Sequence, residues 1–459
     1  MTQHWSAPLS PGRLDATVEL PGSKSLTNRH LLLAALADAP TSLTAPLDSR
    51  DTRLMAAALR TLGAGVETEG TTASGAPLWR VTPLDPGAAA AAEPLQIDCG
   101  LAGTVMRFVP AVAALLRTPV RFDGDPAARR RPMGPVIDAL RQLGATIEGG
   151  EDGFLPFTVT GNDSVTGGEI SIDASGSSQF VSALLLSAAR LPLGLTVRHT
   201  GSTLPSPQHI EMTLEVLRAA GVPASTGADG RSWSVGAAVP APGDVIVEPD
   251  LSNAGPFLAA ALVCGGTVRV PRWPAQTTQI GALWRELLPA MGATVELGAD
   301  SVLAVTADGS PRGIDAADTG ELAPTLAALC AVSEGPSRLT GIAHLRGHET
   351  DRLAALVAEF TRIGVPASEL ADGVEIRPVP GAAHGAVWES YEDHRMATAG
   401  AIVGLAVPGI EVENVETTAK TLPEFTRMWE AMLATATPPA PGGHTPSGSG
   451  SPVSTGANA

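Results

Sequence analysis

The chain has 459 residues, 44% of them hydrophobic, with a formal net charge of −17 and a sequence pI near 4.9. This length predicts two or three domains or one repetitive architecture, and the acidic balance argues against nucleic acid or an anionic membrane as the partner. No apolar run is long enough and free enough of charge to span a bilayer, and the N-terminus lacks a signal-peptide layout.

Six segments share one layout, in which a polar, glycine-bearing loop runs into an unusually apolar helix. In chain order they are residues 22–36, 99–115, 174–188, 250–263, 319–331 and 391–406. Their spacing of roughly seventy to eighty residues is too long for a short-unit solenoid. A helix that is apolar on nearly every face must be buried on all sides, so we predict six buried helices.

A second, amphipathic helix type lies between these segments and ends on glycine, as a helix C-terminus prefers. It ends within residues 58–67, 139–148, 216–225, 288–296 and 359–368. Half-buried strands are predicted from the alternation in residues 13–21, 169–175, 195–200, 244–249 and 267–273. The predicted fold class is α/β: two inside-out domains, each of three β-α-β-α-β-β-like units with buried helices and outer sheets.

Two chain crossings divide these units. We expect a discontinuous first domain of residues 1–21 plus 248–435, and a second domain of residues 22–247. The Pro/Gly-rich stretch 239–250 marks one crossing, and the other falls near Pro21–Gly22 if the N-terminal strand joins the last three units. Residues 436–459 are rich in Pro, Gly and Ser and are predicted to be a disordered tail.

The few cysteines and lysines of the chain indicate its redox environment and two candidate site residues. Cys99, Cys264 and Cys330 cannot all pair, and they lie among small or apolar residues, which predicts reduced, buried thiols in a cytoplasmic protein. Lys24 and Lys420 are the chain's two lysines, and every other cationic side chain among its 30 Lys and Arg is arginine. Because a lysine is a compact charge that arginine does not replace, both are candidates for site chemistry.

Polar residues at the starts of the buried helices predict an anion site. Helix N-termini carry partial positive charge and free N–H donors, so several of them facing one cleft would bind anions. Ser25 and Thr104 are candidate N-caps, and Lys24 and Arg29 flank the first helix start. The third helix opens with more neutral donors than a cap needs, namely Ser177, Ser178 and Gln179.

Two further clusters, residues 346–353 and 391–396, hold charges directly before helices. Glu349 beside cations is a candidate general acid, and Arg352 is a candidate fork for a carboxylate. Arg395 leads a buried helix and must find a polar partner, for which a ligand is one candidate. Simple capping and solvated surface charge are the alternative interpretation.

Taken in order, seven segments resemble the signature motifs of the 5-enolpyruvylshikimate-3-phosphate synthase family, over about residues 12–433: PGSKSLTNR, LAGTVMR, RRRPM, SSQF, RGHETDRL, YEDHRM and AKTLPEF. Each motif is weak alone, but the ordered set is specific. The resemblance implies two inside-out α/β domains that close over substrate. It also implies an enzyme of chorismate and aromatic amino acid biosynthesis that works without cofactor or metal. We expect the chain to be a monomer, although the sequence itself does not reveal its oligomeric state. Its implied reaction moves the enolpyruvyl group of phosphoenolpyruvate to the 5-hydroxyl of shikimate 3-phosphate, releasing phosphate by addition–elimination.

The resemblance also implies roles for individual residues. The implied phosphoenolpyruvate contacts are Lys24, Gly103, Arg131, Gln179, Arg352, Arg395 and Lys420. The implied shikimate 3-phosphate contacts are Lys24, Ser25, Arg29, Ser177, Ser178, Gln179, Ser206, Glu321, His344 and His348. Glu349 matches the acid that handles the methylene proton, while Glu321 and Lys24 compete as the base for the 5-hydroxyl.

Some positions depart from the family's commoner pattern. Glu321 stands where an aspartate is common, His344 where an asparagine is frequent, and His348 where a lysine is frequent. Leu101 and Phe108 flank AGTVMR where asparagine and proline are common. These changes leave the reaction class intact but leave open the pocket's shape and the sensitivity to glyphosate.

Two other functions compete with this interpretation. The sister enzyme, UDP-N-acetylglucosamine enolpyruvyl transferase, typically carries a reactive cysteine or an aspartate in a mobile loop, and the matching region 124–133 has neither at its centre. A non-catalytic anion-binding homologue would lose its acid and base groups first, yet Lys24, Glu321, Glu349 and Lys420 all remain.

Overall fold

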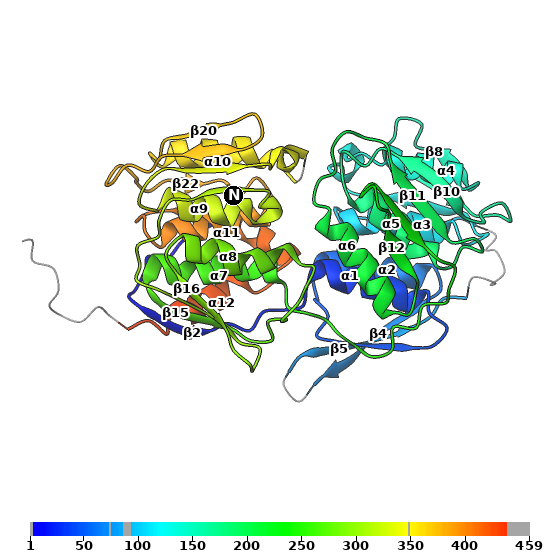
Figure 1. The fold of residues 1–459 in the computed structure, drawn as a ribbon, viewed down its shortest axis with the longest axis horizontal. Coiled ribbons are helices and arrows are strands. Elements are labelled where there is room, and N and C mark those ends of the chain that lie inside the picture. Colours follow the sequence, from blue (N-terminus) through cyan, green and yellow to red (C-terminus); the bar gives the residue numbers. More distant parts are fainter. Residues whose placement is uncertain (1–2, 73–74, 86–92, 348, 438–459) are drawn as a thin grey trace, which may run out of the picture.

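The computed structural model describes residues 3–72, 75–85, 93–347 and 349–437 (Figure 1). The contact predicted for His348 and most of the tail predicted at 436–459 fall outside the described residues.

Apolar side chains are buried in two separate clusters. One is built from residues of the range 26–247 and the other from residues of the ranges 7–20 and 251–433. We call the corresponding parts the continuous half (24–247) and the discontinuous half (3–20 with 251–437). Figure 1 shows them side by side, with blue-to-green helices in one and green-to-red helices in the other, and the blue N-terminal strand β2 (Leu14–Thr17) in the discontinuous half.

The six buried helices predicted from the sequence are present. They are α1 (Lys24–Ala35), α3 (Gly103–Ala113), α5 (Gln179–Ala188), α7 (Leu251–Cys264), α9 (Ala323–Ala331) and α11 (His394–Gly404). Helices α3, α9 and α11 are buried at every residue. A helix without a polar face is stable only when other elements surround it, and α7, α9 and α11 indeed contact one another.

The amphipathic helices cover these buried ones. They are α2 (Arg50–Thr61), α4 (Gly134–Gln142), α6 (Gln208–Ala219), α8 (Trp284–Ala290) and α10 (Arg352–Arg362), and α12 (Phe425–Leu433) follows at the end. The predicted glycine stops are confirmed, because each of the first five helices is followed by a glycine in the left-handed region, such as Gly63 with φ 104° and Gly364 with φ 82°. Side chains other than glycine disfavour that conformation.

Short strands make the outer layer. In the continuous half they are β3 (Thr41–Thr44), β4 (Gly65–Thr71), β5 (Pro77–Thr82), β6 (Leu95–Asp98), β7 (Val120–Asp123), β8 (Thr146–Gly149), β9 (Phe157–Thr160), β10 (Gly168–Ile172), β11 (Leu195–His199), β12 (Ala224–Thr226), β13 (Ser232–Val235) and β14 (Val245–Ile246). In the discontinuous half they are β1 (His4–Ser6), β2, β15 (Gly266–Val270), β16 (Thr294–Leu297), β17 (Leu303–Ala307), β18 (Asp315–Ala317), β19 (Ser337–Thr340), β20 (Ala367–Glu369), β21 (Val374–Ile376), β22 (Val387–Trp388) and β23 (Glu411–Glu413).

These strands form six sheets with one recurring order. Five sheets have four strands, ordered β14-β3-β5-β4, β6-β7-β9-β8, β10-β11-β13-β12, β16-β17-β15-β2 and β18-β19-β21-β20. The last of the six similar units departs from this pattern, because its described sheet has three strands in the order β1-β23-β22. After β23 the chain continues into a 3₁₀ segment, η5 (Val415–Lys420), and α12, and the N-terminal β1 pairs with β23 instead.

Two strands are exchanged between distant parts of the chain. β14 follows the third unit yet pairs in parallel with β3 of the first, and β2 pairs in parallel with β15 of the fourth. The two crossing segments also bond to each other: the Ser23 N–H donates to the Glu248 carbonyl (2.8 Å), and the Asp250 N–H donates to the Pro21 carbonyl (3.0 Å).

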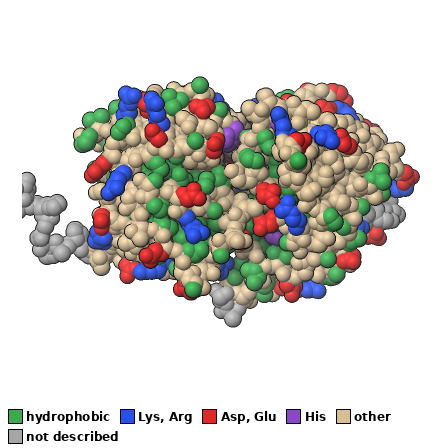
Figure 2. All heavy atoms as spheres, in the orientation of Figure 1, with side chains coloured by type: hydrophobic (Ala, Val, Ile, Leu, Met, Phe, Trp, Pro, Cys, Tyr) green, Lys and Arg blue, Asp and Glu red, His purple; other side chains and the backbone are tan. Residues whose placement is uncertain are grey.

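The structure also describes the cysteines, the length of the helices and the surface charge. The three cysteines are buried and unpaired, as the sequence predicted. Within the described ranges, no helix is both long enough and apolar enough to cross a membrane. Figure 2 shows charged side chains of both signs scattered over both halves on the face in view.

Candidate active site

All six buried helices begin at one cleft between the two halves. Its lining includes one residue from each helix start: Lys24 of α1, Thr104 of α3, Gln179 of α5, the α7 N-cap Asp250, Glu321 in the 3₁₀ turn η3 (Gly320–Leu322) before α9, and His394 of α11. Helix N-termini present unpaired N–H donors and partial positive charge. Their convergence favours an anionic ligand.

The cleft also concentrates cationic side chains. Lysine and arginine line it at five places, namely Lys24, Arg107, Arg131, Arg352 and Arg395, against the carboxylates of Asp250, Glu321 and Glu349. A locally cationic cleft in a chain of net charge −17 is the arrangement that an anionic substrate requires.

Most of the residues predicted from the sequence meet in this cleft. Those that line it are Lys24, Ser25, Arg131, Ser177, Ser178, Gln179, Ser206, Glu321, His344, Glu349, Arg352 and Arg395. Gly103, Arg29 and Lys420 do not line it. Lys420 ion-pairs with the cleft residue Glu349. Gly103 packs against Arg131, because a Cβ at Gly103 would lie 3.0 Å from the Arg131 Nη2.

Arg29 lies beneath the cleft floor. Its Nε donates to the Thr213 hydroxyl (2.8 Å), its Nη1 to the Ser25 carbonyl (3.0 Å) and its Nη2 to the His209 carbonyl (2.9 Å). Burial lowers the pKa of Arg29 to about 9. The guanidinium therefore ties α1 to α6 behind two residues, Ser25 and His209, that do face the cleft.

Glu349 lies between two cations in the discontinuous half. Its Oε2 accepts a hydrogen bond from the Arg352 Nη2 (3.1 Å), and its Oε1 pairs with the Lys420 Nζ. Burial lowers the pKa of Lys420 below its ordinary value, with Glu349 acting in the opposite direction. A carboxylate held by two cations is placed where an incoming anion would compete for those same cations.

Arg352 is itself held from behind by Asp393. The Nε and Nη2 atoms of Arg352 donate to the two carboxylate oxygens of Asp393 at 2.7 and 3.1 Å, and both side chains are almost wholly buried. Burial alone would lower the pKa of Arg352, but Asp393 and Glu349 together raise it above its usual range. Arg352 is thus a fixed, permanent cation at the cleft wall.

Glu321 forms a second ionic group. Its Oε1 accepts a hydrogen bond from the Ser252 hydroxyl (2.6 Å) and lies 3.1 Å from the Arg395 Nη2. Burial would raise the pKa of Glu321, but Arg395, His209 and the Ser252 hydroxyl outweigh burial and hold it well below the usual range. Glu321 is therefore ionised at neutral pH and acts as a hydrogen-bond acceptor.

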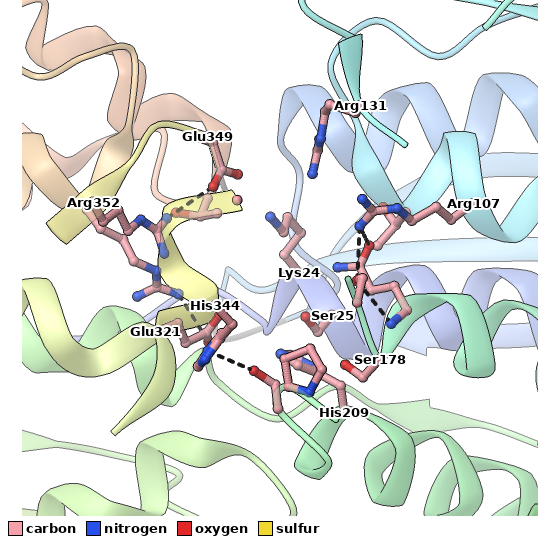
Figure 3. Close-up of a pocket in the computed structure, with 18 of the residues that line it drawn as sticks. Lys24, Ser25, Arg107, Arg131, Ser178, His209, Glu321, His344, Glu349 and Arg352 are labelled. Atoms are coloured by element: carbon pink, nitrogen blue, oxygen red, sulfur yellow. Dashed lines mark hydrogen bonds and ion pairs between the residues drawn. The ribbon is translucent and has the colours of Figure 1, made fainter. Parts of the chain in front are cut away.

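The continuous half supplies the opposite wall (Figure 3). Lys24 points into the cleft with its Nζ 3.6 Å from the buried Asp51 carboxylate. Arg107 Nη1 donates to the Gln179 side-chain oxygen (2.9 Å) and the Ser177 hydroxyl (3.3 Å), which fixes the opening turn of α5. Figure 3 shows Lys24 and Arg131 facing Glu349 and Arg352 across open space.

The two walls also touch at the far end of the cleft. The Ser206 hydroxyl of the continuous half lies 3.5 Å from the His344 Nε2 of the discontinuous half. Burial lowers the pKa of His344, so its imidazole is neutral at pH 7. Ser206 adopts a positive φ of 48° at this contact.

Sequence reasoning assigned no role to several cleft residues. Arg107 lies in the motif LAGTVMR with Gly103, and His394 lies in YEDHRM beside Arg395, so membership of these motifs could have included both. Nothing in the sequence around His209 distinguished it, yet it lines the cleft, and burial lowers its pKa to about 4. Asp250 opens a predicted helix segment, and an acidic helix start could have marked it as an N-cap.

Neither of the candidate caps, Ser25 and Thr104, is the N-cap of its helix. Ser23 caps α1 by accepting a hydrogen bond from the Leu26 N–H (3.5 Å), which leaves the Ser25 side chain to face the cleft. Helix α3 begins after Ala102 without a side-chain cap. Among the described residues, no group of three or more His, Cys, Asp or Glu side chains is arranged to hold a metal ion.

Comparisons with known proteins identify the family to which the chain is similar. Residues 9–429 match the family described as EPSP synthase (3-phosphoshikimate 1-carboxyvinyltransferase). A curated protein of that name from Kocuria rhizophila is 56% identical, over 94% of this chain and 96% of its own length. Another of that name, from Bifidobacterium longum, is 49% identical over 94% of this chain and 99% of its own length.

Solved structures confirm the predicted fold class. An EPSP synthase structure from Acinetobacter baumannii superposes with a TM-score of 0.77 at 26% identity, over 94% of this chain and 98% of that one. The enolpyruvyl transferase NikO from Streptomyces tendae shares the fold, with a TM-score of 0.70 at 20% identity over 93% and 96% of the two chains.

Proposed function

The chain belongs to the EPSP synthase family, and we propose that the cleft between its two halves is the active site. It is a transferase of the shikimate pathway, which leads to aromatic amino acids. It moves the enolpyruvyl group of phosphoenolpyruvate to the 5-hydroxyl of shikimate 3-phosphate and releases phosphate. Both substrates carry a carboxylate and a phosphate, which suits a cleft lined by five cations and six helix starts.

Phosphoenolpyruvate binds between Lys24 and Arg352 in this proposal. Its phosphate meets Lys24, Arg131 and Lys420, with the Gly103 backbone and the Gln179 amide alongside. Its carboxylate meets Arg352 and Arg395. The rigid Arg352–Asp393 pair supports this division, because a guanidinium held in place loses little freedom when it binds a second carboxylate.

Shikimate 3-phosphate lies against the continuous half. Neutral donors at the α5 start are suited to its phosphate, and Ser25 and Ser206 line the same wall: the proposed contacts are Ser25, Ser177, Ser178, Gln179, Ser206, Glu321 and His344. Arg29 contributes through the backbone carbonyls of Ser25 and His209. Glu321, ionised beside Arg395, accepts the hydrogen bond of the reacting 5-hydroxyl and orients it.

Glu349 carries the proposed chemistry. The reaction needs a group that gives a proton to the methylene carbon and later takes one back. Glu349 faces the cleft between Lys420 and Arg352, the two cations proposed for the donor's phosphate and carboxylate. When phosphoenolpyruvate draws those cations to itself, Glu349 loses the ion pairs that keep it ionised and can carry the proton. This position is the single observation on which the assignment depends.

The test is Glu349→Gln, assayed by phosphate release with both substrates. We expect kcat to fall by about 10²–10⁴-fold, the usual contribution of a general acid–base group, while calorimetric affinity for shikimate 3-phosphate stays within about twofold. Glu169→Gln is the matched control, since Glu169 pairs with Arg198 on an exposed sheet (2.5 Å), and it should keep full turnover. A Glu349→Gln enzyme of near-normal kcat would remove Glu349 from the mechanism.

The same assay separates the alternatives. A UDP-N-acetylglucosamine transferase would turn over that acceptor, and a non-catalytic binder would release no phosphate from either mixture. The buried Cys99, whose pKa burial raises above its ordinary value, is unsuited to the role of a reactive loop cysteine.

We also propose the domain boundaries, the oligomeric state and the location of the protein. We place the domain boundaries at 21/22 and 247/248, because the two apolar clusters divide there. The chain is further proposed to be a monomer, and sedimentation near 47 kDa would test this against the 46.6 kDa chain mass. Three unpaired cysteines suit a reducing compartment and support a cytoplasmic location.

A further inference from the structure

The segment that brings Asp393 and Arg395 to the cleft passes through a strained turn. Tyr391 and Glu392 have φ values of 54° and 55°, so two successive residues other than glycine adopt the left-handed conformation. Each such residue costs free energy and persists only where its surroundings impose it. The contacts of this turn should therefore show what holds it.

A buried carboxylate holds the turn from helix α10. The hydroxyl of Tyr391, the chain's one tyrosine, donates to the Glu359 Oε1 (2.6 Å), and the Glu389 N–H donates to the Glu359 Oε2 (3.1 Å). Arg362 Nη1 also donates to that Oε2 (2.8 Å). Glu359 is 0% exposed. Burial raises the pKa of its carboxyl, and the Tyr391 hydroxyl is the largest of the groups that oppose this.

Helix α10 connects this buried contact to the cleft. Arg352 and Glu359 are seven residues apart, so they share one helix face at a separation of about 10 Å. At the cleft end of that face Arg352 binds Asp393, and at the inner end Glu359 binds Tyr391. Residues 389–393 thus run along α10 and are bonded to it before, within and after the left-handed turn, at Glu389, Tyr391 and Asp393.

We propose that Glu359 and Tyr391 are positioning residues for phosphoenolpyruvate, which act by holding the turn that sets Asp393 against Arg352 and aims Arg395 at Glu321. This inference rests on the proposed roles of Arg352 and Arg395 at the donor carboxylate. Neither Glu359 nor Tyr391 is among the described residues that line the cleft, so both act through other side chains. Without the hydroxyl, the turn relaxes and both arginines lose their fixed orientation.

The test is Tyr391→Phe in the full-length enzyme, which removes one oxygen and keeps the ring. We expect KM for phosphoenolpyruvate to rise about tenfold, the size of losing one hydrogen bond to a charged group. Because shikimate 3-phosphate lies mainly on the other half, its calorimetric Kd should stay within about twofold. A change of equal size for both substrates, or no change in KM, would overturn the proposal.

A matched control excludes a merely structural effect. The Ser337 hydroxyl is also buried in the discontinuous half, where it accepts a hydrogen bond from the Ile314 N–H (3.0 Å). Ser337→Ala should lower the melting temperature as Tyr391→Phe does, yet leave KM for phosphoenolpyruvate unchanged. If Ser337→Ala raises that KM equally, loss of stability explains both and the positioning role is refuted.

A double-mutant cycle tests whether Tyr391 acts through the arginine. Arg352→Lys alone should weaken phosphoenolpyruvate binding, and adding Tyr391→Phe should then raise KM by less than about threefold. A full further tenfold rise would show that Tyr391 acts independently of Arg352. If Arg352→Lys leaves KM unchanged, the proposed carboxylate site fails instead, a result that the Tyr391→Phe measurement alone would not give.

Discussion

Asp393→Asn should destabilise the discontinuous half strongly, because it breaks a buried ion pair from one side. Arg352 loses the carboxylate that holds it through two hydrogen bonds, and its side chain is 2% exposed, so water cannot replace the partner. Breaking a buried pair in this way costs about 3–5 kcal/mol. Arg352 keeps its bond to Glu349 (3.1 Å) in this variant, so we expect a cost near the lower end, about 3 kcal/mol.

The expected shift is measurable by tryptophan fluorescence. Five of the chain's seven tryptophans belong to the discontinuous half, namely Trp5, Trp273, Trp284, Trp388 and Trp429, so the thermal transition reports mainly on that half. For a domain of this size each 1 kcal/mol shifts Tm by about 2–4 °C, which gives a decrease of about 6–12 °C.

Asp15→Asn provides the matched control for this measurement. It makes the same chemical change in an exposed pair of the same half, with Arg269 at 2.5 Å and side-chain exposures of 72% for Asp15 and 41% for Arg269. Exposed pairs contribute about 0–1 kcal/mol, so this variant should melt close to the unmodified enzyme. If Asp393→Asn melts within about 2 °C of Asp15→Asn, the buried pair does not support the half and the reasoning is refuted.

Two other substitutions test the cleft. Lys24→Arg keeps the charge but replaces a compact ammonium, which lies 3.6 Å from Asp51, with a bulkier planar guanidinium. We expect kcat/KM to fall about 10²-fold in the phosphate-release assay, without a change in Tm. Near-normal turnover would contradict the role of Lys24. Burial lowers the pKa of His209 from 6.5 to about 4. Between these two pH values His209 is therefore protonated in the unfolded chain and neutral in the folded one. The free energy of unfolding should therefore fall as the pH drops from 6.5 to about 4, by up to about 1.4 kcal/mol per pH unit. In His209→Gln, urea unfolding at several pH values should show a smaller dependence of this free energy on pH. An unchanged dependence would show that His209 does not cause it.

The fold was predictable where the signal is local. A helix apolar on every face has to be buried, and a glycine stop such as Gly364 marks a left-handed residue, so both follow from the sequence alone. The sixth sheet was not predictable in the same way. Its strand β1 is the three residues His4–Ser6, largely exposed, and only its pairing with β23 more than 400 residues later defines it.

In the candidate site, too, the residues within local motifs were predictable and those that depend on distant contacts were not. Motif order identified Glu349 and Arg352, which the structure indeed places in contact. It could not show that Arg29 turns away from the cleft, because the bonds that hold it come from Thr213 and the His209 carbonyl, some 180 positions away in the chain. His209 escaped notice because it belongs to none of the recognised motifs, and only the folded chain brings it to the cleft.

The strand exchange explains why Lys24 occupies its position. Because β2 and β14 each complete a sheet beside the crossings, both crossing segments are anchored, and they pair through Gly22 and Pro249. Gly22 has no room for a side chain, since a Cβ would lie 2.2 Å from the Ala45 carbonyl oxygen. Lys24 follows two residues later, with its backbone N–H bonded to the Asp250 carboxylate that caps α7 (3.3 Å). The bridge between the crossings, the crowding at Gly22 and the bond to Asp250 together fix the backbone of Lys24 where the two halves meet.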